Sequence, residues 1–416
     1  MNVLINAYAV SPSWGSEQGM GWNWVIHIAR YCNVFVITEG QWRKEIEYVL
    51  PILPQKDNIH FYYNPVSERV RKMCWNQGDW RFYLHYRKWQ KKTLKIAYDI
   101  MEEFNIDIIH QLNMVGFREP GFLWRIRNVP FVWGPVCIIE NVPLSLTRNF
   151  PLNQRLTILV KNVITCLQIH FSYRVFRAID SSSTVIAATK MALSRLILYK
   201  NETDVSFINE TGIGVGRSSD RTTHDFDSDE LNIIWVGRFL NTKKLDLALE
   251  SISLLKDLNV SLTVVGGGTP DEMDHYKRMA SSLDIDRMVT WLGMIPHESM
   301  GPLMAKAHLL FFTSISEATS TVVPEAISCN LPIVCFNICG FGPLVKDNVG
   351  ETVEVTDQRQ SAMCFAEKIR DLYNHRDKLK RFSLACDRLK DELTYDHKAK
   401  KVIEIYKNAL ASFSLK

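Results

Sequence analysis

The chain alternates short apolar runs with longer segments of helical periodicity, and this alternation constrains the fold more than any other feature. The apolar runs are nearly continuous in Val, Ile, Leu and Phe, which is typical of parallel strands covered on both faces. Strands that alternate with helices predict doubly wound parallel sheets of the α/β class. The clearest runs are "VLINAYAV", "VFVITEG", "IDIIHQLN", "LNIIWVGR", "VSLTVVGGG", "HLLFFTS" and "LPIVCFN".

A length of 416 residues predicts two Rossmann-like domains, because single hydrophobic cores stop growing well below that size. The break between them lies near Ser206, and the polar, Gly/Ser/Asp-rich stretch 212–230 is interpreted as the start of the second domain and a variable loop. We predict domains at 1–205 and 206–385, with residues 386–416 forming a helix that packs back on the first. Doubly wound sheets bind ligands beyond the carboxyl ends of their strands, so we expect a site in a cleft between the domains.

Two carboxylates, Glu317 and Glu325, lie eight positions apart in "SISEATSTVVPEA", just after an apolar run. Pro324 is tolerated only in the first turn of a helix, so Ser320 or Thr321 is the expected cap. The plain interpretation is a solvated loop that opens a helix. The functional one is a site in which backbone amides near Val322 hold phosphate and the acids accept hydrogen bonds from a sugar and a ribose. An acid, a helix start and a second acid suit a nucleoside-diphosphate sugar.

Two cations, Arg238 and Lys243, follow the first strand of the second domain in "VGRFLNTKK". A forked guanidinium and a mobile ammonium at a strand end suit a diphosphate, and ordinary surface charge is the alternative.

Glycines follow two of the predicted strands, in "SPSWGSEQGMG" and in "VVGGGTP". Gly266 and Gly268 permit a tight turn against a ligand, and Gly15 permits a close backbone approach. Neither stretch matches a dinucleotide fingerprint or a P-loop, which argues against a Rossmann dehydrogenase and an ATPase.

These motifs, in this order, resemble the retaining glycosyltransferases of family 4, which have the GT-B fold. The resemblance rests on Glu317-x7-Glu325, "VGRFLNTKK", "TVVGGG", "VTWLGMIP" and "WGSEQG", and it covers nearly the whole chain. Three places depart from the family pattern, one of which is "GPVCIIEN" (134–141) in place of a Gly-rich turn common in related bacterial sequences. Residues 318–321 replace the usual Gly-Phe-Gly, and Lys244 stands where a Gly usually follows the Lys.

The resemblance implies a retaining, hexosyl-type transferase in which Arg238 and Lys243 hold the donor diphosphate. Glu317 would contact the donor sugar and Glu325 the ribose. The remaining implied contacts are the loop Gly15–Ser16 over the phosphates, Leu292, Gly293 and Met294 near the base, and His110 and Gly134 beside the donor sugar.

The expected chemistry is departure of a nucleoside diphosphate whose growing charge Arg238, Lys243 and helix amides stabilise. Front-face attack, with the phosphate taking the acceptor proton, fits a site with no obvious nucleophilic carboxylate. We expect no metal and no other cofactor, because cationic side chains neutralise the leaving group. The acidic run "DFDSDE" suggests a metal-dependent transferase instead, but it lies in a polar loop and is expected to be solvated.

Basic residues are concentrated in the first half of the chain. Residues 69–95 carry nine Lys or Arg against one acid, interleaved with aromatic side chains, and residues 148–177 carry five and no acid. Leu156, Val160, Val163, Leu167 and Phe171 would form one helical face, either buried in the domain or facing lipid. We expect both stretches to meet an anionic membrane surface, and we expect no nucleic-acid binding.

The nine cysteines include no C-x-x-C pair, and no signal peptide or spanning segment is evident, so we expect a cytoplasmic protein at the inner face of the membrane. The expected function is transfer of a sugar from a nucleotide donor to a growing polysaccharide or lipid-linked oligosaccharide. Two alternatives remain, namely a nucleotide-sugar epimerase or hydrolase on the same scaffold and a non-catalytic partner in a glycan-assembly complex.

Overall fold

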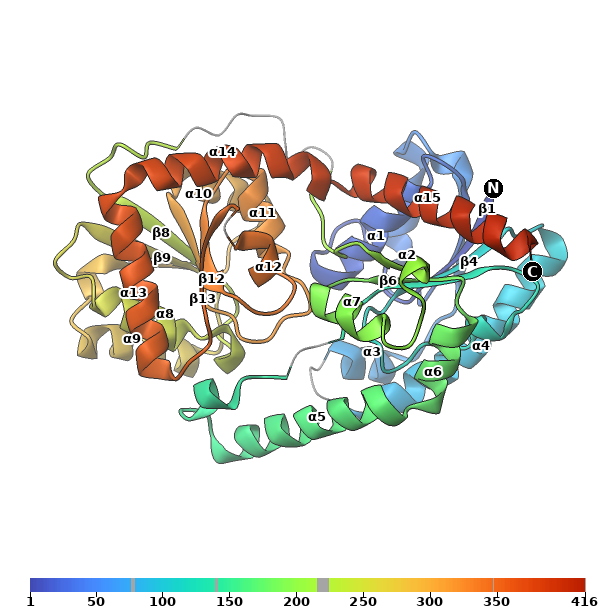
Figure 1. The fold of residues 1–416 in the computed structure, drawn as a ribbon, viewed down its shortest axis with the longest axis horizontal. Helices are drawn as coiled ribbons and strands as arrows, with labels where there is room; N and C mark the ends of the chain where they lie inside the picture. The colour runs from blue at the N-terminus through green and yellow to red at the C-terminus, as the bar shows by residue number, and fades with distance from the viewer. Residues whose placement is uncertain (76–78, 139–140, 215–223, 347, 416) are drawn as a thin grey trace. The chain divides into compact units, whose positions relative to one another are not determined.

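The computed structural model describes residues 1–75, 79–138, 141–214, 224–346 and 348–415, and the chain folds into two compact units (Figure 1). Unit 1 contains Met1–Ile138, Leu167–Gly212 and Thr394–Lys416, and unit 2 contains Ile139–Cys166 and Ile213–Leu393. These units divide the chain differently from the predicted domains, because residues from 141–166 and 386–393 pack into the cores of unit 2. Of the polar stretch 212–230, residues 215–223 lie outside the described residues.

Unit 1 is built on a seven-stranded parallel sheet with the order β3-β2-β1-β4-β5-β6-β7. The chain reverses its direction of growth between β1 and β4, which are neighbours. The strands are β1 (Asn2–Ala7), β2 (Asn33–Thr38), β3 (Ile59–Tyr63), β4 (Ile108–Asn113), β5 (Phe131–Val136), β6 (Thr184–Ala187) and β7 (Val205–Phe207). The helices are α1 (Ser16–Ile28), α2 (Arg43–Val49), α3 (Glu68–Trp75), α4 (Arg81–Glu103), α6 (Tyr173–Ser181), α7 (Lys190–Leu196) and α15 (Tyr395–Ser414).

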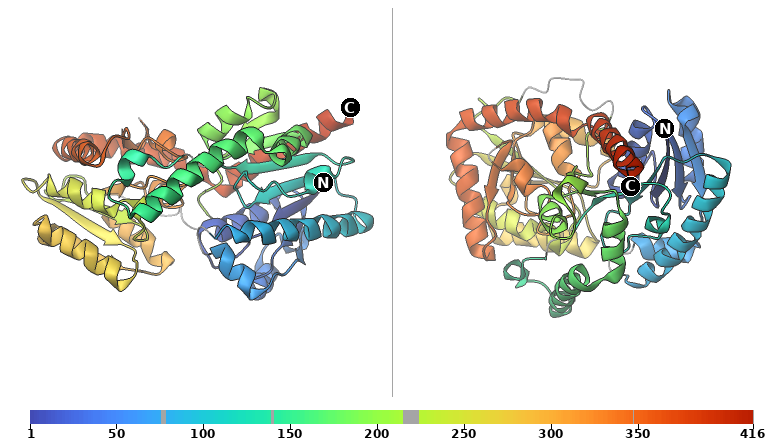
Figure 2. Two further views of the ribbon diagram at one scale, coloured as in Figure 1. Left: turned by 90° about the horizontal axis from the view of Figure 1, so that it is seen from below. Right: turned by 45° about the vertical axis from the view of Figure 1, so that its right-hand side comes forward.

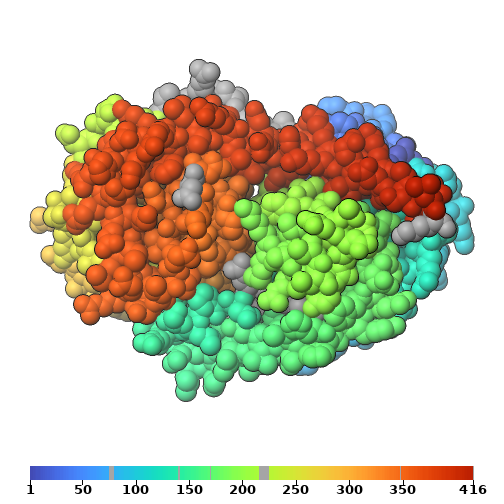
Figure 3. Space-filling model, viewed as in Figure 1, coloured from blue at the N-terminus to red at the C-terminus, as the bar shows by residue number. Residues whose placement is uncertain are grey.

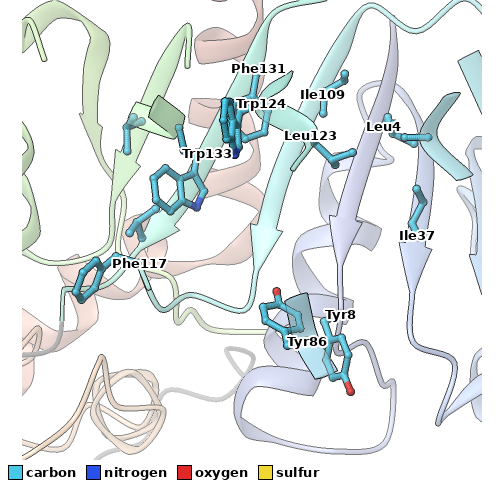
Figure 4. Close-up of a cluster of buried hydrophobic side chains, with 14 of the residues drawn as sticks. Leu4, Tyr8, Ile37, Tyr86, Ile109, Phe117, Leu123, Trp124, Phe131 and Trp133 are labelled. Atoms are coloured by element: carbon cyan, nitrogen blue, oxygen red, sulfur yellow. The ribbon is translucent and has the colours of Figure 1, made fainter. Parts of the chain in front are cut away.

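One face of this sheet is covered by α4, whose apolar stripe is largely aromatic. Phe82, Tyr86 and Trp89 are buried, and the ring of Tyr86 lies edge-on to that of Tyr8 with 5.3 Å between centroids. Figure 4 shows strand side chains of the same cluster, such as Leu4 and Ile109, which line this face of the sheet. Three of the five aromatic side chains described in the basic stretch 69–95 therefore form core.

The opposite face of the sheet is covered by α1 and α15. Trp24 of α1 is fully buried, its indole N–H donates to the Glu210 carbonyl over 2.9 Å, and its ring contacts that of Tyr395. The ends of the two helices are joined by an ion pair of 2.8 Å between Arg30 and Asp396. The predicted packing of the last helix on the first domain is visible in these contacts.

Unit 2 is built on a six-stranded parallel sheet with the order β10-β9-β8-β11-β12-β13. Its strands are β8 (Leu231–Val236), β9 (Val260–Val265), β10 (Val289–Gly293), β11 (Leu309–Phe312), β12 (Ile333–Phe336) and β13 (Gly350–Val353). Its helices are α8 (Leu245–Ser253), α9 (Pro270–Ser282), α10 (Met300–Lys306), α11 (Val322–Ser328), α12 (Gly342–Val345), α13 (Gln358–Asn374) and α14 (Arg376–Leu393). The two parallel sheets confirm the predicted α/β class.

The core of unit 2 has helices on both faces of its sheet. Phe365 of α13 packs edge-on against Phe311 and Phe336 on one face, and α11 covers the other. Helix α14 runs along the surface of this unit (Figure 3). Leu146 and Phe150, which precede helix α5, are buried in the same core as Trp235.

Helix α5 (Leu152–Phe171) is a single helix of 20 residues (Figure 2). Its first part, up to Cys166, is assigned to unit 2, and the rest to unit 1.

Candidate functional site

The loops that follow β8 and β11 meet at the point where the second sheet reverses its direction of growth. The two strands are adjacent and parallel, with Leu310 paired to Ile234. The backbone N–H of Ile315 donates to the Thr242 carbonyl over 2.9 Å, and the Thr313 hydroxyl donates to the Lys243 carbonyl over 2.8 Å. These bonds hold the two loops together beyond the carboxyl ends of their strands, where such sheets bind ligands.

Lys243 and Glu317 form an ion pair between these two loops. The same Glu317 oxygen accepts a hydrogen bond of 2.9 Å from the Ser314 hydroxyl. The Lys243 ammonium also lies 5.6 Å from the centre of the Phe312 ring. The structure therefore brings together the predicted cation and the predicted first acid. Arg238 follows shortly after the end of β8, and its side chain is exposed.

The backbone conformation at Lys244 gives a reason why glycine is usual at this position. Its backbone is left-handed, with φ 55° and ψ 47°, a conformation that costs most side chains about 1 kcal/mol. The side chain is nevertheless buried, and its ammonium lies 2.7 Å from Asp246 and 5.3 Å from the centre of the Phe150 ring. Asp246 also accepts from Gln358 over 3.1 Å. At this departure from the family pattern, a buried ammonium thus forms an ion pair with a partly buried carboxylate.

We expect Lys244→Gly and Lys244→Ala both to destabilise the protein, because each leaves Asp246 without its cation. The glycine variant should be the more stable of the two by about 1 kcal/mol, since only the alanine retains a Cβ in the left-handed region. Urea unfolding of the two variants measures this difference. Equal stability would show that the backbone at this position is not strained.

The second predicted acid, Glu325, lies in the first turn of α11. Its carboxylate is 3.6 Å from the Nε2 atom of His297, which precedes α10. Pro324 occupies the first turn as predicted, and Thr321 occupies the cap position without a side-chain cap hydrogen bond. Ser320 is buried beside it. Glu317 thus lies within the segment that leads from β11 into α11, and Glu325 lies in the first turn of the helix that follows.

The glycines after β9 have a packing reason. Gly266 has φ 127°, and a Cβ there would lie 1.8 Å from the Gly237 carbonyl oxygen. A Cβ on Gly268 would lie 2.9 Å from the Cβ of Phe239 and 2.3 Å from the more easily displaced Glu272 carboxylate. Neighbouring parts of the chain thus lie too close to both positions for a side chain. That the two glycines also approach a ligand stays a prediction. Leu292 and Met294 flank Gly293 at the end of β10, and both side chains are exposed.

Within unit 1, the loop after β1 leads directly into α1. Gly15 is the residue before the helix, and Ser16 begins it with φ 55°. Gly134 in β5 has φ 135°, and a Cβ there would lie 2.3 Å from the Ile186 carbonyl oxygen. Gly134 is therefore required by the packing of β5 against β6.

His110 of β4 is fully buried, with both ring nitrogens engaged. Nε2 donates to the Gly134 carbonyl over 2.6 Å, so Nδ1 accepts from the Tyr406 hydroxyl over 2.5 Å. Burial lowers the pKa of His110 to about 4, which keeps the ring neutral. These contacts tie α15 to the sheet, and the expected role of His110 toward a donor sugar stays a prediction.

Glu17 is a titratable group in "WGSEQG" that the sequence reasoning did not select. It accepts a hydrogen bond of 3.0 Å from the Val115 backbone, and burial raises its pKa to about 7. The signal in the sequence is a lone acid among glycines just after a buried strand. Its carboxyl is the one group in this motif able to exchange a proton near neutral pH.

The two basic stretches differ in what they expose. Trp80 and Tyr83 are exposed in the stretch 69–95, but its other described aromatic side chains are core, and residues 76–78 lie outside the described part. In contrast, the apolar face predicted for Leu156 to Phe171 on α5 is exposed along its whole length. The alternative that this face is buried in the domain is therefore wrong. No helix among the described residues is both long and apolar enough to cross a bilayer.

One residue of the acidic run after residue 224 forms an ion pair on the protein surface. Asp227 pairs with Lys380 of α14 over 2.6 Å and is largely exposed. Within the described part of the chain, no three His, Cys, Asp or Glu residues gather as a metal site would require.

Comparison with protein families finds that residues 216–385 match the model described as glycosyl transferases group 1. One relative is the phosphatidylinositol N-acetylglucosaminyltransferase GPI3 subunit of Saccharomyces cerevisiae (strain YJM789), 24% identical over 196 residues, 47% of this chain and 43% of the relative. The chain thus spans less than half the length of the curated relatives it matches first.

Solved structures match over nearly the whole chain. A glycosyltransferase from Rickettsia africae ESF-5 has a TM-score of 0.67 at 17% identity and covers 98% of both chains. Anabaena Alr3699/HepE in complex with UDP has a TM-score of 0.62 at 15% identity, covering 97% of this chain and 99% of that one. At such identities the likeness shows the fold alone. The resemblance inferred from the motifs is confirmed, and residues 216–385 are a glycosyl transferases group 1 domain within a chain of GT-B fold.

Proposed function

We propose that this protein transfers a sugar from a nucleoside-diphosphate donor to a growing polysaccharide or a lipid-linked oligosaccharide. The observation that carries the proposal is the Lys243–Glu317 pair, which lies at the switch point of the sheet in a group 1 domain. A cation and an acid held side by side suit a ligand with a diphosphate next to a hydroxyl-rich sugar. UDP in the structure of the Anabaena neighbour supports a nucleotide donor.

In this proposal Lys243 and Arg238 bind the diphosphate and stabilise the charge that develops as it leaves. Glu317 exchanges its bond to Lys243 for sugar hydroxyls, and Glu325 accepts from the ribose. Transfer proceeds with retention by front-face attack, in which the departing phosphate takes the acceptor proton. The two cations replace a metal in neutralising the leaving group.

The acceptor is proposed to be presented at an anionic membrane surface, at the inner face of the membrane. The yeast relative named above is a phosphatidylinositol N-acetylglucosaminyltransferase subunit, which supports a lipid-borne acceptor. The exposed apolar face of α5, flanked by Arg155 and Lys161, supports attachment to such a surface.

Calorimetric titration of the full chain with UDP, GDP, ADP and CMP tests the donor site. We expect one diphosphate to bind, and we expect Arg238→Ala to weaken it about tenfold, as loss of a charge-assisted hydrogen bond does. Arg381→Ala, which removes an exposed guanidinium on α14, is the matched control and should bind as the unaltered protein does.

If no nucleotide binds to the folded protein, the transferase proposal fails and a non-catalytic partner in glycan assembly takes its place. Conversion of the donor sugar without any acceptor would favour the epimerase or hydrolase alternative.

A further inference from the structure

Helix α5 carries an apolar face that the described protein does not cover. We call it the α5 face; its members are 42% to 78% exposed and are Leu152, Leu156, Leu159, Val160, Val163, Ile164, Leu167 and Phe171. They recur at intervals of three or four residues, with Leu159/Val160 and Val163/Ile164 as adjacent pairs, which places them on one side of the helix. Arg155 and Lys161 are exposed beside them, and no acid occurs between residues 141 and 179. An exposed apolar face of this extent marks an interaction surface.

The start of the same helix is bonded to the loop that carries Lys243. The Asn241 side-chain amide donates to the Gln154 side-chain oxygen over 2.7 Å. Phe150, just before the helix, is 7% exposed and packs below the ammonium of Lys244. Two residues close to Lys243 in the chain are thus in contact with this region. Asn241 bonds to Gln154 in the first turn of α5, and Lys244 contacts Phe150 just before the helix.

We propose that Gln154 and Phe150 are positioning residues of the donor site, and that anionic lipid on the α5 face strengthens nucleotide binding through them. The inference rests on the proposed function, since it concerns regulation of the same site. A helix fixed on a surface restricts the loop bonded to its start. Lipid contact therefore reduces the conformational entropy that the loop loses when a diphosphate binds.

The charges on α5 decide which occupant the α5 face takes. A second copy packed on this face about a twofold axis would bring two helices together that each carry Arg155 and Lys161, with no acid on either helix to offset these charges. An anionic lipid surface attracts the same cations and accepts the apolar side chains below the headgroups. The surface therefore fits a lipid layer of negative charge.

The first experiment measures the affinity of the full chain for UDP, or for whichever diphosphate binds, in the absence of lipid. Gln154→Ala should weaken it about fivefold, the factor expected for one hydrogen bond of ordinary strength. Gln154→Glu keeps an acceptor oxygen for Asn241 and should restore the affinity. Unchanged affinity in Gln154→Ala would overturn the link while leaving the donor site intact, whereas no diphosphate binding by the unaltered protein would remove the proposed function itself.

The second experiment adds vesicles of equal parts phosphatidylcholine and phosphatidylglycerol. The unaltered protein should sediment with them and bind the diphosphate several-fold more tightly than in solution. Leu156→Glu with Val160→Glu should bind it normally in solution and lose both vesicle effects, while Leu384→Glu, at an exposed position of α14, should lose neither. Vesicle binding without a change in affinity would overturn the coupling. A dimer that only the α5 double variant abolishes would overturn the lipid occupant.

Discussion

Lys243→Ala is expected to reduce sugar transfer by about 10²- to 10³-fold, the loss seen when one preorganised charge-stabilising group is removed from a polar active site. The ammonium is held between Glu317 and the Phe312 ring, in the place where we propose that the diphosphate binds. The variant should also weaken binding of the free diphosphate. Both effects are measurable, by calorimetry and by transfer of a labelled sugar to a membrane extract.

Lys256→Ala is the control for this prediction. It removes an ammonium that is half exposed and 3.4 Å from Asp284, on the same unit but away from the two loops. Transfer by the control should equal that of the unaltered protein. A Lys243→Ala protein with normal transfer would show that the ion pair is a surface contact and that the diphosphate binds elsewhere.

His110 is expected to make the stability of the protein depend on pH between about 6.5 and 4, the range between its unfolded and folded pKa values. In this range the unfolded chain binds a proton that the buried ring does not, so the free energy of unfolding falls as the pH falls. The full loss corresponds to about 3 kcal/mol at 1.36 kcal/mol per pKa unit. The contribution is fully present above pH 6.5.

Comparison with His110→Gln isolates this contribution, because other groups titrate in the same range. Glu17, whose pKa is raised to about 7, acts in the opposite sense, since its folded form binds a proton more strongly than its unfolded form. It is present in both proteins. Urea unfolding at neutral and acidic pH should therefore give a smaller loss in the variant, and equal losses would show that the ring is protonated without cost.

The residues that could be predicted from the sequence are those whose chemistry coincides with the end of a strand. Glu317 and Lys243 follow buried apolar runs, and parallel strands bring such positions to one edge. The pattern does not contain the side-chain path that joins them, through Thr313 and Ser314. It also does not distinguish a glycine required by a ligand from one required by a neighbouring carbonyl, as at Gly266.

Aromatic and basic composition is ambiguous for the same kind of reason. In α4 Phe82, Tyr86 and Trp89 recur at helical spacing and enter the core, while the cations remain outside. In α5 the apolar side chains recur at the same spacing and stay exposed. A period of 3.6 residues reveals that a helix has two faces, but the partner of the apolar face depends on tertiary packing. The burial of His110 has a similar explanation. Its two hydrogen-bonding partners lie on β5 and α15, far away in the sequence, so a local sequence pattern does not predict them.

Each unit is built from separate segments of the chain, and this limits where the protein can be cut into independent fragments. Neither unit is one continuous stretch, since the chain passes between them after Ile138, Cys166, Gly212 and Leu393. A fragment that ends near residue 205 would lack α15, and with it the Tyr406 hydroxyl that His110 bonds to. Expression of either unit as a separate soluble domain would thus need a rejoined or permuted gene, with α15 returned to the first half and residues 141–166 supplied to the second.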